Sequence, residues 1–525
     1  MPSTATATRN IQSTAILAII LVSYFMILLD NSIIFTGLPS IQAEMGYSTT
    51  GLAWVQDAYT LVFGGLLLLG ARAGDLLGRR RIFIIGLAVF STASLLVGLA
   101  PNGQWLIGAR ALQGVGAAVV APSSLSLLTA SFAPGRERTR AVAWYGATAG
   151  IGASLGLVIG GALAHWISWR AGFLINVPIG AAMILLAPRF IPASPRTPGR
   201  FDVAGAVTAT LGMGALVFGI ISSADAGWLA PQTLPALGAG AVLLAVFVAN
   251  EWRAGQPIMP LRLFASRERS GAYLARMLYM GAMIGFFYFT TQFLQDVLGF
   301  NPLQAGTAFF PMTVVNFAVA MAIPRLTARF GNAALLAVGV AVTLAAMVWL
   351  SRVTVDSSYI SGVALPMVLL GIGQGLAFAP LTSAGIARVT AADAGAASGL
   401  VNTAHQLGSS LGLAVLVTAA AATAIGNGGA RAAMAGHVSA ALTAGSVMLA
   451  LCLLASLALV VPADSRPGQP KSPPPEGNNH GIHAPGRVRS EVSRIAFGCM
   501  GFGAPGTGRD WTLDDAAAGI LPLPS

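Results

Sequence analysis

Long apolar stretches separated by short polar loops dominate the first 461 residues of the chain. Fourteen such stretches cover residues 14–36, 51–71, 82–100, 105–127, 141–163, 172–191, 203–222, 234–250, 272–292, 306–324, 333–351, 361–381, 398–424 and 440–461. A run of about 20 apolar residues is long enough to cross the ~30 Å hydrocarbon layer as a helix. Backbone groups find no water there and must pair within the segment, which favours helices. The pattern predicts an all-α membrane protein with 14 transmembrane helices.

The arginines give these helices a direction. The loops that follow even-numbered stretches hold 17 arginines, whereas the odd loops hold only Arg170, Arg352 and Arg431. Positively charged loops stay on the cytoplasmic side, so we expect both termini to be cytoplasmic. The first stretch lacks a cleavage pattern and is read as an uncleaved span behind a cytoplasmic segment, residues 1–13. We expect a multi-pass protein of the cytoplasmic membrane of a bacterium, since Ala, Gly and Arg dominate as in GC-rich genomes.

Composition narrows the function classes. Hydrophobic residues make up 55% of the chain and charged residues 9%, against roughly 25% charged residues in soluble proteins. The net charge of +11 follows from the loop arginines and a basic tail, so no nucleic-acid partner is needed. The two cysteines, Cys452 and Cys499, provide neither a disulfide framework nor a metal cluster. We expect no metal, no cofactor and no enzymatic activity, because no catalytic constellation appears.

An internal repeat organises the chain. The segment Gly152-Ala-Ser-Leu-Gly-Leu-Val-Ile159 returns as Gly408-Ser-Ser-Leu-Gly-Leu-Ala-Val415, 256 residues later, and residues 46–53 are echoed about 254 residues on. This offset predicts two six-helix bundles, residues 14–191 and 272–461, with two accessory helices in residues 203–250. Parallel repeats are typical of transporters with a substrate site between the halves. The alternative is coincidence between Gly- and Ala-rich helices.

The last segment, residues 464–525, differs from the rest. It contains Pro473-Pro-Pro475 and many Gly and Asn residues, and it has no apolar run long enough to span a membrane. We expect a disordered cytoplasmic tail.

A charged motif lies between the second and third stretches: Gly74-Asp75-Leu-Leu-Gly78-Arg79-Arg80-Arg81. It resembles the Gly-x-Leu-x-Asp-x-x-Gly-Arg-Arg signature loop of the major facilitator superfamily, although Ala71 and Ala73 depart from that pattern. Gly78 permits a tight turn, and Asp75 can bind backbone amides or pair with an arginine. The resemblance implies a gating loop formed by the residues Gly74, Asp75, Gly78, Arg79 and Arg80. The alternative is an ordinary cytoplasmic loop.

The fourth stretch carries Arg110-Ala-Leu-Gln113-Gly114-Val-Gly116-Ala-Ala118. This segment matches the superfamily's Arg-x-x-Gln-Gly-x-Gly-Ala-Ala motif at every defined position. An arginine inside a span is costly unless it is paired or faces water, so it indicates a functional site. Gln113 lies on nearly the same helix face as Arg110, and the two glycines allow close helix approach.

Two acidic residues join this arginine as candidates for proton coupling. Leu29-Asp30-Asn31-Ser32 opens a segment that resembles a motif of the 14-span drug:proton antiporters, with Phe35 in place of an asparagine; Trp54-Val-Gln-Asp57 is also similar to this family. By topology, Asp30, Asp57 and Arg110 lie in the outer halves of their helices, so we expect one buried charge cluster. The alternative is that Asp30 is a static partner for Arg110.

The fifth stretch resembles the antiporter motif Gly-x-x-x-Gly-Pro-x-x-Gly-Gly through its glycines, with Leu157 in the proline position. These glycines are Gly152, Gly156, Gly160 and Gly161, and together with Gln113, Gly114 and Gly116 they are predicted to pack helices around a substrate cavity. Without the proline, the expected kink is lost.

The resemblance implies a secondary transporter of the major facilitator fold, driven by the proton gradient and exporting amphipathic organic compounds or drugs. Its partners would be a small-molecule substrate, protons and the lipid bilayer, with a monomer as the working unit. Two alternatives remain within transport: a metabolite exporter of narrow specificity and a proton symporter. A third alternative is a non-transporting membrane sensor with the same fold.

Overall fold

The computed structural model describes residues 4–132, 135–193, 196, 199, 201–390, 393–423 and 429–464, and within this part of the chain every regular element is helical. The helices of the first half are α1 (Thr4–Met45), α2 (Ala53–Leu77), α3 (Arg79–Gly98), α4 (Gly103–Ser131), α5 (Arg136–Trp166), α6 (Trp169–Leu174) and α7 (Asn176–Phe190). The next two are α8 (Val203–Ala226) and α9 (Thr233–Arg253).

The second half repeats this density of helices. It contains η1 (Leu261–Ala265), α10 (Arg267–Gln292), η2 (Phe293–Val297), α11 (Pro302–Thr307), α12 (Phe310–Leu350), η3 (Tyr359–Ala364), α13 (Leu365–Gly385), α14 (Ala394–Ala421), α15 (Gly429–Ala455), η4 (Ser456–Val460) and α16 (Val461–Asp464). The predicted tail, residues 464–525, lies outside the described residues apart from Asp464.

Twelve helical segments of the described residues are long and apolar enough to cross a membrane. They confirm a multi-pass, all-helical protein, and two regions bear on the predicted number of spans. Residues Pro302–Leu350 form one continuous segment, but Gly331 interrupts α12 with a φ of 78°. Helix α5 contributes a shorter apolar piece, Leu155–Trp166. Helix α1 begins at Thr4, so much of the predicted N-terminal segment continues the first helix.

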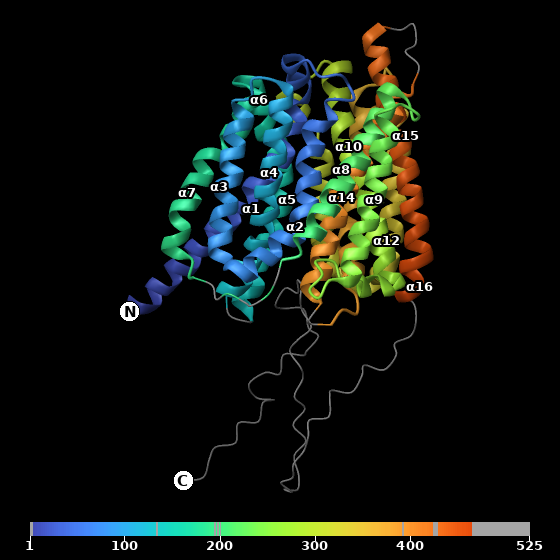
Figure 1. The fold of residues 1–525 in the computed structure, drawn as a ribbon. Coiled ribbons are helices and arrows are strands. Elements are labelled where there is room, and N and C mark those ends of the chain that lie inside the picture. Colours follow the sequence, from blue (N-terminus) through green and yellow to red (C-terminus); the bar gives the residue numbers. More distant parts are fainter. Residues whose placement is uncertain are drawn as a thin grey trace, which may run out of the picture. The chain divides into compact units, whose positions relative to one another are not determined.

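Two groups of helices pack within themselves and then against each other. In the first group α1 packs on α5, and α4 packs on both α2 and α3; in the second, α10 packs on α14 and α15, and α12 on α13. Figure 1 shows α1, α3, α4 and α7 gathered on one side and α10, α12, α14 and α15 on the other. The groups meet where α2 contacts α14 and where α11 contacts α5.

The accessory helices border the line of contact between α2 and α14. Helix α8 packs on both of them and on α9, and the Thr418 hydroxyl of α14 donates to the Ile220 carbonyl of α8 at 2.9 Å. Helix α9 is peripheral, because only 17% of its apolar 18-residue stretch is buried. For the segment that contains α10, 83% of the corresponding stretch is buried. The interior is therefore built around α10 and its neighbours.

The repeated glycine segment performs the same packing in both halves. In α5, a Cβ on Gly156 would lie 2.6 Å from the Ser32 Cβ of α1. In α14, a Cβ on Gly412 would lie 2.2 Å from the Gly281 Cα of α10. Such approach is possible only without a side chain, so the repeat encodes two equivalent helix crossings.

Candidate functional site

Asp30 and Arg110 form an ion pair in the interior of the first helical group. The Arg110 Nη1 atom donates to Asp30 Oδ2 at 2.8 Å, and neither side chain is exposed. Helix α1 supplies the acid and helix α4 the base. Taking two charges out of water costs several kcal/mol each unless they are paired and hydrogen-bonded. The sequence prediction that Asp30 and Arg110 lie together is confirmed.

Three neutral polar side chains complete this network. Gln113 donates from Nε2 to Asp30 Oδ1 at 2.7 Å and to the Ser94 hydroxyl at 2.8 Å. Asn176, at the start of α7, donates to the same Asp30 oxygen at 2.9 Å. The carboxylate of Asp30 thus accepts three hydrogen bonds from two other helices, α4 and α7. Gln113 is buried within this network, as the spacing to Arg110 suggested.

Arg110 is held on several sides. Its Nε atom donates to the Val55 carbonyl of α2 at 2.9 Å, and Nη1 also donates to Gln113 Oε1 at 2.6 Å. The Tyr59 ring lies 4.3 Å from the guanidinium carbon, a distance at which a cation is attracted to the ring face. Within the part of the chain that the structure describes, Nη2 has no hydrogen-bond partner. The guanidinium is therefore fixed in place through Nε and Nη1, and its Nη2 group is left unpaired there.

Asp57 does not join this cluster, so the predicted three-member arrangement is wrong at this residue. Its neighbour Gln56 donates to the Asn31 side chain of α1 at 3.0 Å, and successive helical residues point about 100° apart. Asp57 therefore turns towards the second helical group, where it faces the Ser410 hydroxyl of α14. Neither carboxylate oxygen has a well-formed hydrogen bond to any residue that the structure describes, although Asp57 is buried.

The predicted gating loop is a one-residue turn. Gly78 separates α2 from α3 and has a φ of 98°, a conformation that favours glycine. Asp75 accepts from Arg79 Nε at 3.2 Å and Nη2 at 3.1 Å. Arg80 donates to the Ile191 carbonyl after α7 at 3.0 Å. These contacts tie together α2, α3 and α7, all within the first helical group.

The remaining predicted glycines lie at helix contacts. A Cβ on Gly114 would lie 2.6 Å from the Tyr59 carbonyl oxygen of α2, and one on Gly116 would lie 2.6 Å from the Phe90 nitrogen of α3. Gly152 and Gly160 face α1, whereas Gly161 faces the Pro302 carbonyl of α11 in the second helical group. Gly74 has no close contact below 3.7 Å. All of these glycines except Gly74 thus act in helix packing, and Gly161 acts between the groups.

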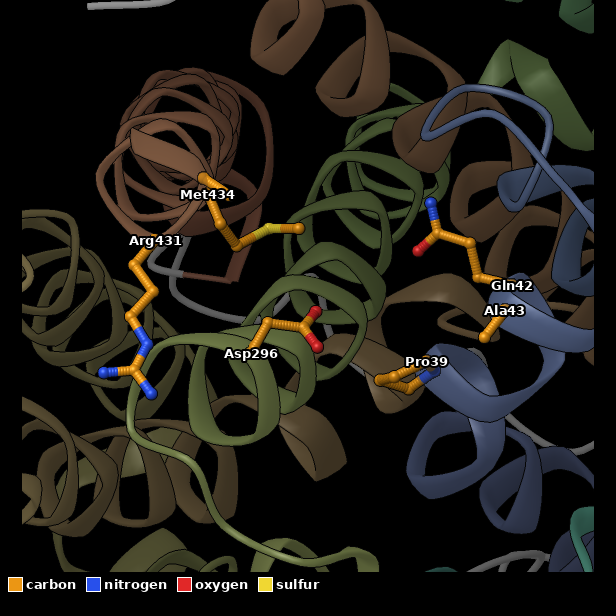
Figure 2. Close-up of a pocket in the computed structure, with 7 residues that line it drawn as sticks. Pro39, Gln42, Ala43, Asp296, Arg431 and Met434 are labelled. Carbon is orange, nitrogen blue, oxygen red and sulfur yellow. The ribbon is translucent and has the colours of Figure 1, made fainter. Parts of the chain in front are cut away.

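A cavity of about 380 Å³ lies between the end of α1, η2 and the start of α15. Figure 2 shows Asp296 between Arg431 and Met434 on one side and Pro39 and Gln42 on the other. Nearby, the Phe35 ring stacks on Phe287 of α10, with centroids 5.7 Å apart. Opposite charges, amides and apolar side chains therefore meet where the two groups join.

Sequence reasoning missed two members of this network: Asn176, which donates to Asp30, and Ser94, which accepts from Gln113. Ser94 follows two other hydroxyl residues of α3, Ser91 and Thr92, and Asn176 is the first residue of α7. A polar residue in a span that is otherwise apolar was the available signal, but its direction depends on helix rotation that sequence does not give.

Comparison with known proteins places this geometry in context. The profile of the Major Facilitator Superfamily matches residues 20–413. The cephamycin export protein CmcT of Amycolatopsis lactamdurans is 39% identical over 464 residues, covering 87% of this chain and 95% of that protein. The multidrug efflux pump LfrA of Mycolicibacterium smegmatis is 34% identical, covering 79% and 82% of the two chains.

A solved structure agrees at the level of fold. The inward-facing, occupied structure of a bacterial homolog of the human lysosomal transporter Spinster aligns with a TM-score of 0.62 and 16% identity. The alignment covers 86% of this chain and 97% of that one.

Proposed function

Because the chain belongs to the major facilitator superfamily, we propose that it exports amphipathic organic compounds, drugs among them, in exchange for protons across the cytoplasmic membrane of a bacterium. It is a multi-pass membrane transporter and not an enzyme. Relatives that match about three quarters or more of the chain are named for cephamycin export, puromycin resistance and multidrug efflux. These names support export of organic compounds as the direction and substrate class.

The buried ion pair carries the proposal of proton coupling. Asp30 has one cationic partner, Arg110, and two amide donors. While Arg110 stays in place, the carboxylate is stabilised in its charged form. If a conformational change withdraws Arg110, the buried carboxyl must take up a proton, since an isolated charge is too costly in the membrane. Proton uptake and release at Asp30 would then follow the conformational cycle.

Asp57 supplies a second proton-binding group in this proposal. It lies on α2 facing α14, so its surroundings change whenever the two helical groups move relative to each other. Arg110 and Asp30 both belong to the first helical group, whereas Asp57 lies at the contact between the groups. We assign it the smaller role, because it has no cationic partner among the described residues.

We propose 14 spans in two six-helix bundles, residues 14–191 and 272–461, with α8 and α9 as accessory spans. Two features support raising the number of spans from the 12 candidate segments of the described residues to 14. Helix α12 has 41 residues, about 60 Å at 1.5 Å per residue, which is twice the ~30 Å layer. Helix α5 has 31 residues, enough to cross once. An even number of spans places both termini on the same side of the membrane, and the arginine-rich loops make that side the cytoplasm, with the tail 464–525 on it.

Alternating access follows from where the groups touch. At the end of the molecule containing the α1–α2 loop, Gly306 approaches the Leu157 carbonyl of α5, and Phe35 stacks on Phe287. We propose that these contacts close the outer side and that the cavity beside Asp296 and Arg431 is part of the exit when they separate. The turn at Gly78 lies at the opposite end of α2, where we propose that Asp75, Arg79 and Arg80 control opening on the inner side.

Transport by purified protein in proteoliposomes tests the proposal. Ethidium is supplied outside the vesicles and a pH difference is imposed across their membrane. We expect transport of ethidium across the membrane that stops when an ionophore collapses the pH difference. Substrate moving in the same direction as protons would indicate symport. A panel of unrelated dyes separates broad from narrow specificity. Absence of flux for every compound, with a folded protein, would favour the non-transporting alternative.

A further inference from the structure

Arg276 is a buried arginine without an acidic partner. It lies on α10 with 3% exposure, and none of the ion pairs among the described residues includes it. Arg110, the other buried arginine, has Asp30 at 2.8 Å. The two helical groups therefore treat a buried guanidinium differently: one neutralises it, and the other leaves it charged.

The neighbours of Arg276 are neutral. Nη1 donates to the Thr382 hydroxyl of α13 at 3.3 Å, and Nη2 lies 3.2 Å from His405 Nδ1 of α14. Because a guanidinium can only donate, Nδ1 must be the acceptor and the histidine proton sits on Nε2. The Phe378 ring covers the guanidinium at 3.9 Å. None of these groups supplies negative charge.

One donor of Arg276 remains free. Nε is buried and has no hydrogen-bond partner among the described residues, so both a charge and a directed N–H are uncompensated there. A buried charge in a membrane span is costly, so its presence indicates a function. The close crossing of α10 and α14, where a Cβ on Gly408 would lie 2.4 Å from the Met277 Cα, holds the arginine beside His405.

The arginine lies one layer below accessible side chains. Phe378, Thr382 and His405 are all half-buried, so each of the side chains around the guanidinium is itself partly accessible. Arg276 is near the start of α10, and His405 lies in the first half of α14, whose preceding loop carries Arg388. In the proposed topology this is the inner half of the membrane, where an exporter takes up its cargo.

We propose that Arg276 binds the anionic group of an amphipathic substrate, with Thr382 and His405 positioning the guanidinium and Phe378 contacting the apolar body. The inference rests on the proposed transport function and adds that the substrate class includes organic anions carrying a carboxylate, sulfonate or phosphate. An anionic lipid headgroup offers the same chemistry. Arginine suits such a group because its planar fork binds two oxygens at once.

The test compares two probes that differ in one charge. 8-Anilinonaphthalene-1-sulfonate is an amphipathic anion, and N-phenyl-1-naphthylamine is the same ring system without the sulfonate. Their affinities are measured for the full-length protein in phosphatidylcholine nanodiscs, with empty nanodiscs subtracted. We expect Arg276→Gln to weaken the sulfonate by about tenfold or more, the effect of losing a charged hydrogen bond, and to change the neutral probe by less than about twofold.

Two further variants secure the result. Tyr279→Phe, one turn along α10, removes a buried hydroxyl that contacts Thr343 without changing charge, and both affinities should stay unchanged. Arg276→Lys keeps the charge and loses the fork, so the sulfonate should weaken only severalfold. If Arg276→Gln does not fold, the lysine variant decides. Equal weakening of both probes, or an unchanged sulfonate affinity, would overturn the proposal.

Two arms separate the possible sources and the underlying function. Phosphatidylglycerol added to the nanodiscs should compete with the sulfonate on the native protein, and not on Arg276→Gln, if the site takes lipid phosphate; no competition assigns the site to exported compounds. Ethidium export is measured for the native protein and for Tyr279→Phe, and both should export the dye at similar rates. Failure of the native protein to export ethidium would contradict the proposed function while the probe affinities still judge the anion site.

Discussion

Asp30→Asn is expected to destabilise the protein strongly, because it strands the positive charge of Arg110. The new amide has a single oxygen, which can still accept from Gln113 and Asn176, but its NH₂ group would then face Arg110 Nη1, now 2.8 Å from Asp30 Oδ2. Breaking a buried pair in this way costs roughly 3–5 kcal/mol. Arg110 keeps its bond to the Val55 carbonyl and its contact with the Tyr59 ring, so we expect a loss near 3 kcal/mol.

A double-mutant cycle measures whether the two residues act as a pair. Arg110→Gln should also destabilise, but less at low pH, because a buried carboxyl can take up a proton whereas a guanidinium cannot lose one. The double variant Asp30→Asn/Arg110→Gln removes both charges and should recover much of the lost stability. The detergent-solubilised protein is heated, and its unfolding is measured as the loss of its monodisperse peak.

The chain offers a matched control for this cycle. Arg170 and Glu44 form an ion pair at the same distance, 2.8 Å, but with side-chain exposures of 25% and 46%. Exposed pairs contribute about 0–1 kcal/mol, so Glu44→Gln should have a small effect. The reasoning is refuted if Asp30→Asn is no less stable than Glu44→Gln, or if the double variant loses as much stability as the two single variants together.

Three other outcomes are expected. Gly116→Val should sharply lower the yield of folded protein, because even a Cβ would lie 2.6 Å from the Phe90 nitrogen, whereas Gly108→Val, at a position with open space, should not; equal yields would contradict the packing role. Asp75→Asn should lower the free energy of unfolding by at most about 1 kcal/mol, since its pair with Arg79 is partly exposed. The variant should nevertheless slow turnover with little change in substrate affinity. A large loss of affinity at unchanged turnover would argue against a gate. The Arg262 guanidinium lowers the pKa of Asp393 below its usual range. The pair therefore stabilises the protein at pH values above the ordinary aspartate pKa of ~3.9, and this stabilisation is lost as the pH falls through the lowered pKa. The stability difference between the native protein and Arg262→Gln should vanish in acid and persist at about pH 7.

The sequence predicted most of the helices because apolar length and loop charge are strong, additive signals. Gly78 was predicted as a tight turn, and it is one because the motif leaves a single residue between α2 and α3. Arg110, Gln113 and Asp30 were predicted to lie together, since a buried arginine needs partners and the spacing of Gln113 places it on the same face.

The position of Asp57 could not be predicted because it depends on helix rotation. Gln56 and Asp57 are adjacent, and a rotation of α2 by one residue would exchange the side chain facing Asn31 for the one facing Ser410. The direction of Ser94 and Asn176 was hidden for the same reason. The burial of Arg276 likewise depends on the close contact between α10 and α14, which the sequence does not give.

Coupled movement of substrate and protons is the most direct test of the central claim. Proteoliposomes containing the native protein and a trapped pH-sensitive dye are given an outward substrate gradient without an imposed pH difference. We predict that substrate leaving the vesicles drives protons inward, that the internal pH falls, and that Asp30→Asn abolishes this change in protein that remains folded. Substrate efflux with an unchanged internal pH, or an undiminished pH change in Asp30→Asn, would contradict the account.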